Sequence, residues 1–139
     1  MTSEANKLTM QKFVEFINTA SEALAGELIS TEAIFHVPGR PEPMQGPAGY
    51  LAIIGMMREG FPDIQWTLEE MVAESDKVAA RFTMRGTHQG PFFGVAPTGK
   101  KIAVQAMNLY RLSNGKFVEE RGQPDMLGLL QQIGAAPSN

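Results

Sequence analysis

Residues 115–130 read GKFVEERGQPDMLGLL, and this stretch decides how the chain is interpreted. It follows a hairpin signal at Asn114-Gly115, continues as a strand with several ionisable side chains, and changes abruptly into a short apolar helix at Met126. Asp125 lies at this change. Its carboxylate either caps the helix by accepting free backbone N–H groups, or projects into an apolar cavity and acts as a general acid/base. The residues alone leave both roles open.

Alternation of apolar and polar residues before this stretch predicts an antiparallel sheet. In one predicted strand Phe82, Met84 and His88 share a face, and in the next strand Asn108 and Tyr110 do so. The predicted strands are 64–74, 77–89, 100–112 and 116–123, joined by a tight turn at 75–77, a loop at 90–99 and the hairpin at 114–115.

Apolar residues recur every three or four positions in the N-terminal part of the chain, and this spacing predicts helices there. The four prolines between Pro38 and Pro47 require a loop, which is expected to fold over the mouth of a pocket. The predicted elements are a helix from Ser3 to about Ala25 that breaks near Asn18, a strand at 33–37, the loop at 38–47, a helix from Gly46 to about Glu59, and a last helix at 126–133.

Helices followed by a meander of long strands indicate an α+β fold. The strands are expected to curl into a half-barrel with the helices on one face. We expect one domain over residues 1–139, with a loose tail at 135–139.

Composition excludes several classes of function. The formal net charge of -3 provides no basic surface, which argues against nucleic acid as a partner. The chain has no cysteine, so disulfides, thiolate catalysis and cysteine-containing zinc sites are ruled out. Its two histidines lie in separate predicted strands without a carboxylate at ligand spacing, so no metal site is expected. Neither a signal peptide nor an apolar run of membrane-spanning length occurs, so a soluble, cytoplasmic protein without membrane contact is expected.

Several side chains are candidates for a site. His88 either polarises a carbonyl group or is a hydrogen-bonded structural histidine, and His36, beside the proline-rich loop, has the same two roles open. Asn108 and Tyr110 suit hydrogen bonding to a substrate, although Tyr110 is equally a core residue. Arg121 either pairs with Glu119 on the surface or holds Asp125 ionised in a cavity. Phe82, Met84, Phe92 and Phe93 are expected to wall a pocket, with core packing as the alternative.

The motifs FPDI at 61–64, RGTHQG at 85–90, VAPTGK at 95–100 and GKFVEE at 115–120 occur in order. With QPDMLGLLQQIG at 123–134, they resemble the SnoaL-like polyketide cyclases, over most of the chain and most strongly from Phe61 onward.

The resemblance implies the curved α+β cone of the nuclear transport factor 2-like superfamily, with an apolar cavity and a homodimer formed through the sheets. It implies intramolecular aldol cyclisation of a small hydrophobic molecule without metal or organic cofactor. The acid/base carboxylate of the family lies in a Pro-Asp step that Asp125 matches. A cyclase histidine that holds the substrate carbonyl falls on Asn108 here, and His88, in a His-x-Gly step of the family, is the candidate to replace it.

Two hypotheses follow. One is a cofactor-free cyclase or isomerase with Asp125 as general acid/base and His88 or Asn108 at the enolate oxygen. The other is a small-molecule-binding module of the same fold without turnover. Epoxide hydrolysis is disfavoured, because it requires an Asp-Arg-Asp group and Asp63 and Asp76 lie in turns.

Overall fold

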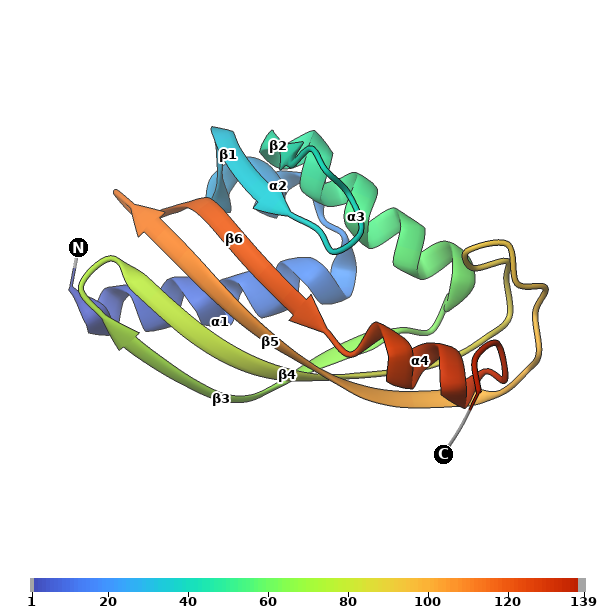
Figure 1. Ribbon diagram of the computed structural model, residues 1–139. Coiled ribbons are helices and arrows are strands. Elements are labelled where there is room, and N and C mark those ends of the chain that lie inside the picture. The colour runs from blue at the N-terminus through green and yellow to red at the C-terminus, as the bar shows by residue number, and fades with distance from the viewer. Residues whose placement is uncertain (1, 138–139) are drawn as a thin grey trace.

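The computed structural model describes residues 2–137 (Figure 1). Helix α1, Ser3–Thr19, begins at Thr2, whose hydroxyl accepts the Ala5 N–H at 3.1 Å. It ends where Ala20 adopts a left-handed conformation with φ 55°. Ser21 then caps helix α2, Glu22–Leu28, by accepting the Leu24 N–H. The break expected near Asn18 is therefore confirmed, two residues further along the chain.

Strand β1, Ile29–His36, is longer than the predicted 33–37. The proline-rich segment after it contains the short strand β2, Met44–Gln45, which pairs with β1. Helix α3, Gly46–Gly60, starts with a proline in its first turn, as predicted.

The sheet has six strands in the order β2-β1-β6-β5-β4-β3. Its long strands are β3 (Gln65–Glu74), β4 (Lys77–Thr87), β5 (Lys101–Ser113) and β6 (Lys116–Pro124). Neighbouring strands are antiparallel except for β1 and β6, which run parallel. Helix α4, Met126–Gln132, follows β6 directly.

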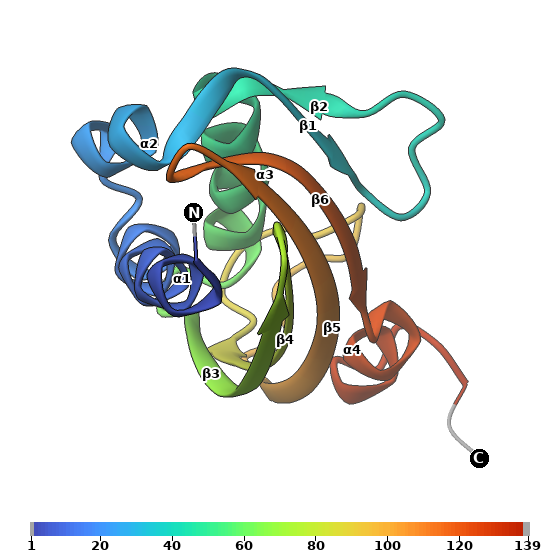
Figure 2. The same cartoon turned by 90° about the vertical axis from the view of Figure 1, so that its left-hand side faces the viewer.

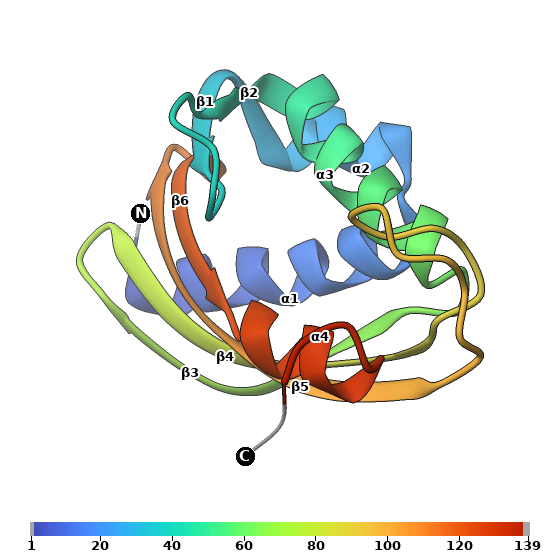
Figure 3. The ribbon, with the colours of Figure 1, turned by 45° about the vertical axis from the view of Figure 1, so that its right-hand side comes forward.

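The sheet is curved and does not close on itself. Figure 2 shows it curling around α1 and α3, which cover its inner face, whereas α4 lies at the far end of β6 (Figure 3). The predicted α+β class, with a curved sheet and N-terminal helices, is confirmed. The four long strands are antiparallel as predicted, whereas β1 runs parallel to β6. The segment 135–139 expected to be a loose tail lies partly outside the described residues, and its Ala135 N–H and Pro137 carbonyl are hydrogen-bonded to α4.

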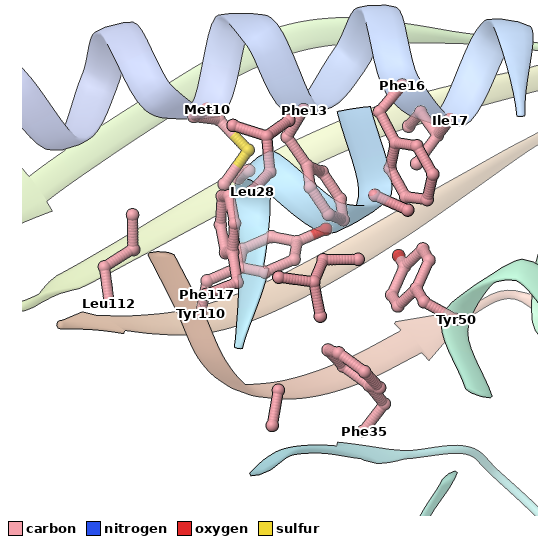
Figure 4. Packing of buried hydrophobic residues seen from close by; sticks show 14 of the residues in the cluster. Met10, Phe13, Phe16, Ile17, Leu28, Phe35, Tyr50, Tyr110, Leu112 and Phe117 are labelled. Atoms are coloured by element: carbon pink, nitrogen blue, oxygen red, sulfur yellow. The ribbon is translucent and has the colours of Figure 1, made fainter. Parts of the chain in front are cut away.

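Two clusters of buried side chains form the interior. The larger lies between α1, α2, α3 and the sheet and is rich in aromatic rings (Figure 4). The smaller lies at the other end of the sheet and contains Met57, Phe61, Met84, Phe92 and Leu129. No helix among residues 2–137 is long and apolar enough to cross a membrane.

Candidate active site

A cavity of about 100 Å³ lies between α3 and the inner face of the sheet, where β1, β6 and β5 adjoin. Polar side chains gather on the strand side, and apolar side chains cover the rest. The described lining residues are Ile17, His36, Val37, Pro38, Tyr50, Ile53, Ile54, Met57, Trp66, Met84, Asn108, Glu120, Gly122 and Pro124.

Glu120 supplies the carboxyl group of this cavity. It pairs with Tyr110 in β5 and with Phe35 in β1, and it is only 8% exposed. The Tyr50 hydroxyl donates a hydrogen bond of 2.8 Å to Glu120 Oε1. Burial raises the pKa of the Glu120 carboxyl to about 7, although hydrogen bonds from the hydroxyls of Tyr50 and Tyr110 oppose this shift. A carboxyl group that titrates near neutrality can both take up and return a proton.

Both tyrosine hydroxyls stay protonated beside this carboxyl. Burial, together with the nearby charge of Glu120, raises the pKa of Tyr50 and that of Tyr110 well above the usual value. Tyr110 is not among the described lining residues; its hydroxyl accepts a hydrogen bond of 3.0 Å from Asn108 Nδ2. Asn108 itself lines the cavity, and its Oδ1 accepts the Gln123 N–H at 3.2 Å. The network thus fixes the orientation of the Asn108 amide.

Gly122 leaves room for these polar groups. It lies opposite Asn108 in the sheet. A Cβ atom at Gly122 would lie 3.1 Å from Glu120 Oε2 and 3.2 Å from Asn108 Oδ1, closer than nearly all such contacts in proteins. The absence of a side chain therefore lets the carboxyl and the amide share one wall of the cavity.

His36, at the end of β1, lines the cavity and is half-buried. Its Nε2 lies 3.4 Å from Glu119 Oε2, and the same carboxylate lies 3.5 Å from Arg111 Nε and from Arg121 Nη2. Although burial acts to raise the pKa of Glu119, the contacts with His36, Arg111 and Arg121 hold it below its usual value. An ionised Glu119 therefore holds the His36 ring on the outer face of the sheet, where His36 also pairs with Arg121, beside the edge of the cavity.

The apolar side of the cavity combines α3 with the sheet. Ile53, Ile54 and Met57 come from α3, and Trp66 and Met84 come from β3 and β4. The edge strand β3 is tied to α1 because the Asn18 side chain forms hydrogen bonds of 2.8 and 3.0 Å with the N–H and carbonyl of Trp66.

Asp125 does not lie in this cavity. It is exposed at the N-cap of α4, where its Oδ1 accepts the Gly128 N–H at 2.8 Å. A Cβ atom at Gly128 would collide with this carboxylate, so the glycine is needed for the close capping contact. The expectation that Asp125 faces an apolar cavity is wrong about its position, and the helix-cap alternative describes its contacts.

His88 is fully buried outside the lining of the cavity. Its Nδ1 accepts the Thr98 N–H at 3.2 Å and lies 3.0 Å from the Thr98 hydroxyl, while its ring packs near Phe61. His88 therefore stabilises the loop between β4 and β5 through its contacts with Thr98. It does not line the cavity, so it cannot take the place of the cyclase histidine there.

Four other candidates also lie away from the cavity. Arg121 is exposed on the outer face and pairs with Glu119 rather than with Asp125. Phe82 is part of the larger core cluster, and Phe92 packs against Phe61 in the smaller one. Phe93, with φ 48°, is 63% exposed on the loop.

A β-bulge explains why Glu120 was missed. Leu112 pairs with Phe117 and Arg111 pairs with Glu119, so Val118 is an extra residue in β6. Strict alternation from the buried Phe117 would turn Glu119 and Arg121 inward, whereas the bulge turns Glu120 and Gly122 inward instead. Tyr50, the partner of Glu120, lies far away in the sequence, and no local signal predicted the pair.

Potential metal ligands do not cluster in the described part of the chain: no group of three or more histidine, cysteine, aspartate or glutamate side chains could hold a metal ion there. Glu120 and Tyr50, whose side chains are hydrogen-bonded to each other in the cavity lining, are suited to proton transfer and hydrogen bonding.

Comparison with known proteins identifies the family. The family model described as SnoaL-like polyketide cyclase matches residues 7–133. The chain is 29% identical over 131 residues to the aklanonic acid methyl ester cyclase DnrD of Streptomyces peucetius, covering 90% of this chain and 88% of that protein. Among solved structures it is similar to IdmH from Streptomyces antibioticus, with TM-score 0.83 and 31% identity over 92% of this chain and 97% of that one. TsrD from Streptomyces laurentii gives TM-score 0.85 and 25% identity over 98% and 99% of the two chains. These matches support a cyclase or isomerase role, and the chain belongs to the SnoaL-like polyketide cyclase family.

Proposed function

We propose that the protein is a cyclase or isomerase that moves a proton on a small hydrophobic carbonyl compound, with Glu120 as general acid/base. The observation that carries this proposal is a carboxyl group in a largely apolar cavity, with a pKa raised to about 7 by burial. Such a group is present in both protonation states near neutral pH, as proton abstraction and return require.

In the proposed reaction, ionised Glu120 removes a proton from the carbon next to the substrate carbonyl. The enolate oxygen accepts a hydrogen bond from the second N–H of the Asn108 amide, whose first N–H is used by Tyr110. The enolate carbon then attacks a second carbonyl carbon of the same molecule, and Glu120 returns the proton to the new alkoxide. Reprotonation at another carbon gives an isomerisation instead. In both cases substrate and product are isomers, and the steps involve no cofactor.

We infer that this role belongs to Glu120 rather than Asp125. The family resemblance aligns its carboxylate with Asp125, but the contacts of Asp125 are those of a surface helix cap. Glu120 lies five residues earlier, on the inner face of the strand that leads to the same helix.

The test compares two conservative substitutions, Glu120→Gln and Asp125→Asn. Enolisation is measured without knowledge of the natural substrate, as deuterium uptake at the α-carbon of small ketones and 1,3-diketones in heavy water, followed by NMR. We expect Glu120→Gln to slow uptake by roughly 100-fold or more, because general acid/base catalysis contributes about 10²–10⁴-fold. Asp125→Asn is expected to change it by less than about twofold, since asparagine caps a helix as well as aspartate.

Circular dichroism of both variants shows whether the fold is kept. If folded Asp125→Asn loses exchange and folded Glu120→Gln retains it, the assignment of the acid/base to Glu120 is wrong. If wild-type protein binds carbonyl compounds but exchanges none of them, the alternative of a binding module is favoured over an enzyme.

We further propose a homodimer formed through the outer face of the sheet. Val72, Ala79 and Leu109 form a row across three strands on that face, and Val72 and Leu109 are 69% and 44% exposed. Met107, 57% exposed, lies in β5 beside this row. The expected cytoplasmic location stays a prediction.

A further inference from the structure

The Tyr50 hydroxyl has a fixed position beside Glu120, because the Tyr50 ring is packed among three other rings. The ring centroids of Phe13, Phe16 and Phe35 lie 5.1, 5.8 and 4.7 Å from that of Tyr50. Figure 4 shows Tyr50 reaching from α3 into this group of rings. Close-packed side chains of this kind have little freedom to move. The hydrogen bond of 2.8 Å from the Tyr50 hydroxyl therefore holds Glu120 Oε1 at one point.

The second oxygen of this carboxyl lies beside Gly122. A Cβ atom at Gly122 would be 3.1 Å from Glu120 Oε2 and 3.2 Å from Asn108 Oδ1, so both polar groups approach the glycine more closely than a side chain would allow. Gly122 and Asn108 both line the cavity. Oε2 is thus next to the amide that is proposed to bind the enolate oxygen, whereas Oε1 is engaged by Tyr50.

The groups that surround the Glu120 carboxyl come from four elements. Burial raises the pKa of the carboxyl, and hydrogen bonds from Tyr50 in α3 and Tyr110 in β5 act to lower it. Strand β1 contributes Phe35, which pairs with Glu120 in the sheet, and α1 contributes Ile17 to the cavity lining. These two side chains carry no ionisable group. The two tyrosine hydroxyls are therefore the groups through which a substitution without a change of charge can alter the titration of Glu120.

We propose that Tyr50 and Gly122 are positioning residues for Glu120. Tyr50 holds Oε1, and Gly122 leaves the space in which Oε2 exchanges a proton with a substrate carbon whose carbonyl oxygen is bound by Asn108. The C–H bond breaks, its electron pair moves into the carbonyl group, and the proton goes to Oε2, from which it later returns to the substrate. This inference rests on the proposed function in taking Glu120 as the acid/base, and it assigns the transfer to one oxygen.

The role of Tyr50 is tested by Tyr50→Phe, which removes the hydroxyl and keeps the ring. Deuterium exchange of small ketones is measured as a function of pH. The ¹³C signal of the Glu120 carboxyl, identified by its absence from Glu120→Gln, is titrated in parallel by NMR. Leu51→Ala is the control, because Leu51 is the next residue of α3 and packs against the same cluster without belonging to the described cavity lining.

Ionised Glu120 is the proposed base, so exchange should rise with pH through the pKa of this carboxyl. Tyr50→Phe removes a hydrogen bond that lowers this pKa. The exchange profile and the NMR titration should therefore both move to higher pH by about one pH unit. Leu51→Ala should reduce stability and leave both midpoints in place. A folded Tyr50→Phe with the midpoints of the wild type would overturn the role of Tyr50.

The role of Gly122 is tested by comparing Gly122→Ala with Gly86→Ala. Gly86, in β4, is similarly crowded, because a Cβ atom there would lie 3.2 Å from Phe61 Cβ, but it is not among the described lining residues. Neither glycine has a positive φ, so the backbone accepts alanine at both positions. Gly122→Ala should reduce exchange at least tenfold, because the methyl group displaces Oε2 from the substrate carbon. Gly86→Ala should change exchange by less than about twofold, and equal exchange in the two variants would refute the role of Gly122 even if Tyr50→Phe failed to fold.

Failure of the proposed function is distinguishable from failure of this inference. If Glu120→Gln abolishes exchange while Tyr50→Phe and Gly122→Ala behave as the wild type does, the acid/base assignment stands and the positioning roles are wrong. If no ketone is exchanged but the Glu120 signal titrates at higher pH in Tyr50→Phe, the enzyme and the role of Oε2 are rejected. The hold of Tyr50 on Oε1 is then kept.

Discussion

Glu120 is a buried ionisable carboxyl group, and burial makes its charged form unfavourable. Hydrogen bonds from Tyr50 and Tyr110 stabilise its ionised form, but burial outweighs them and its pKa rises to about 7. Groups perturbed in this way by desolvation and specific partners occur preferentially in functional sites. Glu119, its neighbour in sequence, has its pKa lowered by contacts with a histidine and two arginines. Two adjacent carboxyl groups thus differ in charge at neutral pH because one points inward and the other outward.

The raised pKa of Glu120 predicts a specific pH dependence of stability. Its value rises from 4.5 to about 7 on folding, so the native state binds the proton more tightly than the unfolded state. The stabilisation is complete below about pH 4.5 and is lost as the pH rises through about 7, a change of about 3 kcal/mol. Urea unfolding of wild type and Glu120→Gln should therefore give free energies of unfolding whose difference shifts by this amount between pH 4 and pH 8. A constant difference over this range would show that Glu120 does not titrate in the native state as proposed.

Substitution of Asp125 should change the stability of the fold but not catalysis. Asp125→Ala should lower the free energy of unfolding by about 1 kcal/mol, because the Gly128 N–H loses its acceptor, and Asp125→Asn should be nearly neutral. Both variants should retain deuterium exchange. Unfolding in urea measures the first effect, and exchange that is lost in folded Asp125→Ala would contradict the assignment of a purely capping role.

At the level of elements, β6 shows how far the sequence could be interpreted. Its existence, its hairpin with β5 and the helix after Pro124 were all predicted, because turn signals and the change of hydrophobic period are local. The inward direction of Glu120 was not predicted. It depends on the extra residue Val118, and a single bulge reverses which side chains of a strand face the core. The burial of Tyr50 beside Glu120 is likewise a long-range fact with no local pattern.

The loop between β4 and β5 is docked on the end of α3 through backbone contacts. The N–H groups of Gln89 and Gly90 both donate to the Gly60 carbonyl at 3.1 Å, and a Cβ atom at Gly90 would collide with the Glu59 carbonyl oxygen. Gly90→Ala must therefore shift the backbone, and we expect it to lower the free energy of unfolding by about 1–3 kcal/mol.

Gly55→Ala, in α3, is the matched control for this prediction. A Cβ atom there meets nothing within 4 Å, and alanine is favoured over glycine in a helix by about 0.5–1 kcal/mol. Gly90→Ala and Gly55→Ala should thus change the unfolding midpoint in opposite directions. A neutral Gly90→Ala would show that the loop is not held closely against α3.

For the whole molecule, the order of helices and strands predicted the fold class, whereas the sequence could not predict how the interior is divided. The curved sheet encloses two clusters of side chains with a small cavity between them, and residues predicted for a pocket are distributed over all three. Phe82 and Phe92 pack in the clusters, Asn108 lines the cavity, and Met84 belongs to the smaller cluster and to the lining. The alternation of residues along a strand predicts which face of the sheet a side chain lies on. Whether that side chain packs in a cluster or lines the cavity depends on its position along the strand, which the alternation does not give.

The outer face of the sheet bears the interface of the proposed homodimer. In a two-fold interface the row of Val72, Ala79 and Leu109 would meet its own copy, so added positive charge on this face would repel itself. The double substitution Met107→Lys with Leu109→Lys adds to Arg81 and Arg121, which neighbour these positions on the adjoining strands. Sedimentation velocity should show a dimeric wild type, a monomeric double variant with unchanged circular dichroism, and a dimeric Leu8→Lys control, since Leu8 is 64% exposed on α1, away from the sheet face. A double variant that sediments as the wild type does, or a wild type that stays monomeric as its concentration rises, would exclude a dimer through this face.

A folded monomer that retains deuterium exchange would show that the cavity is complete within one chain, as its lining by residues of a single chain requires.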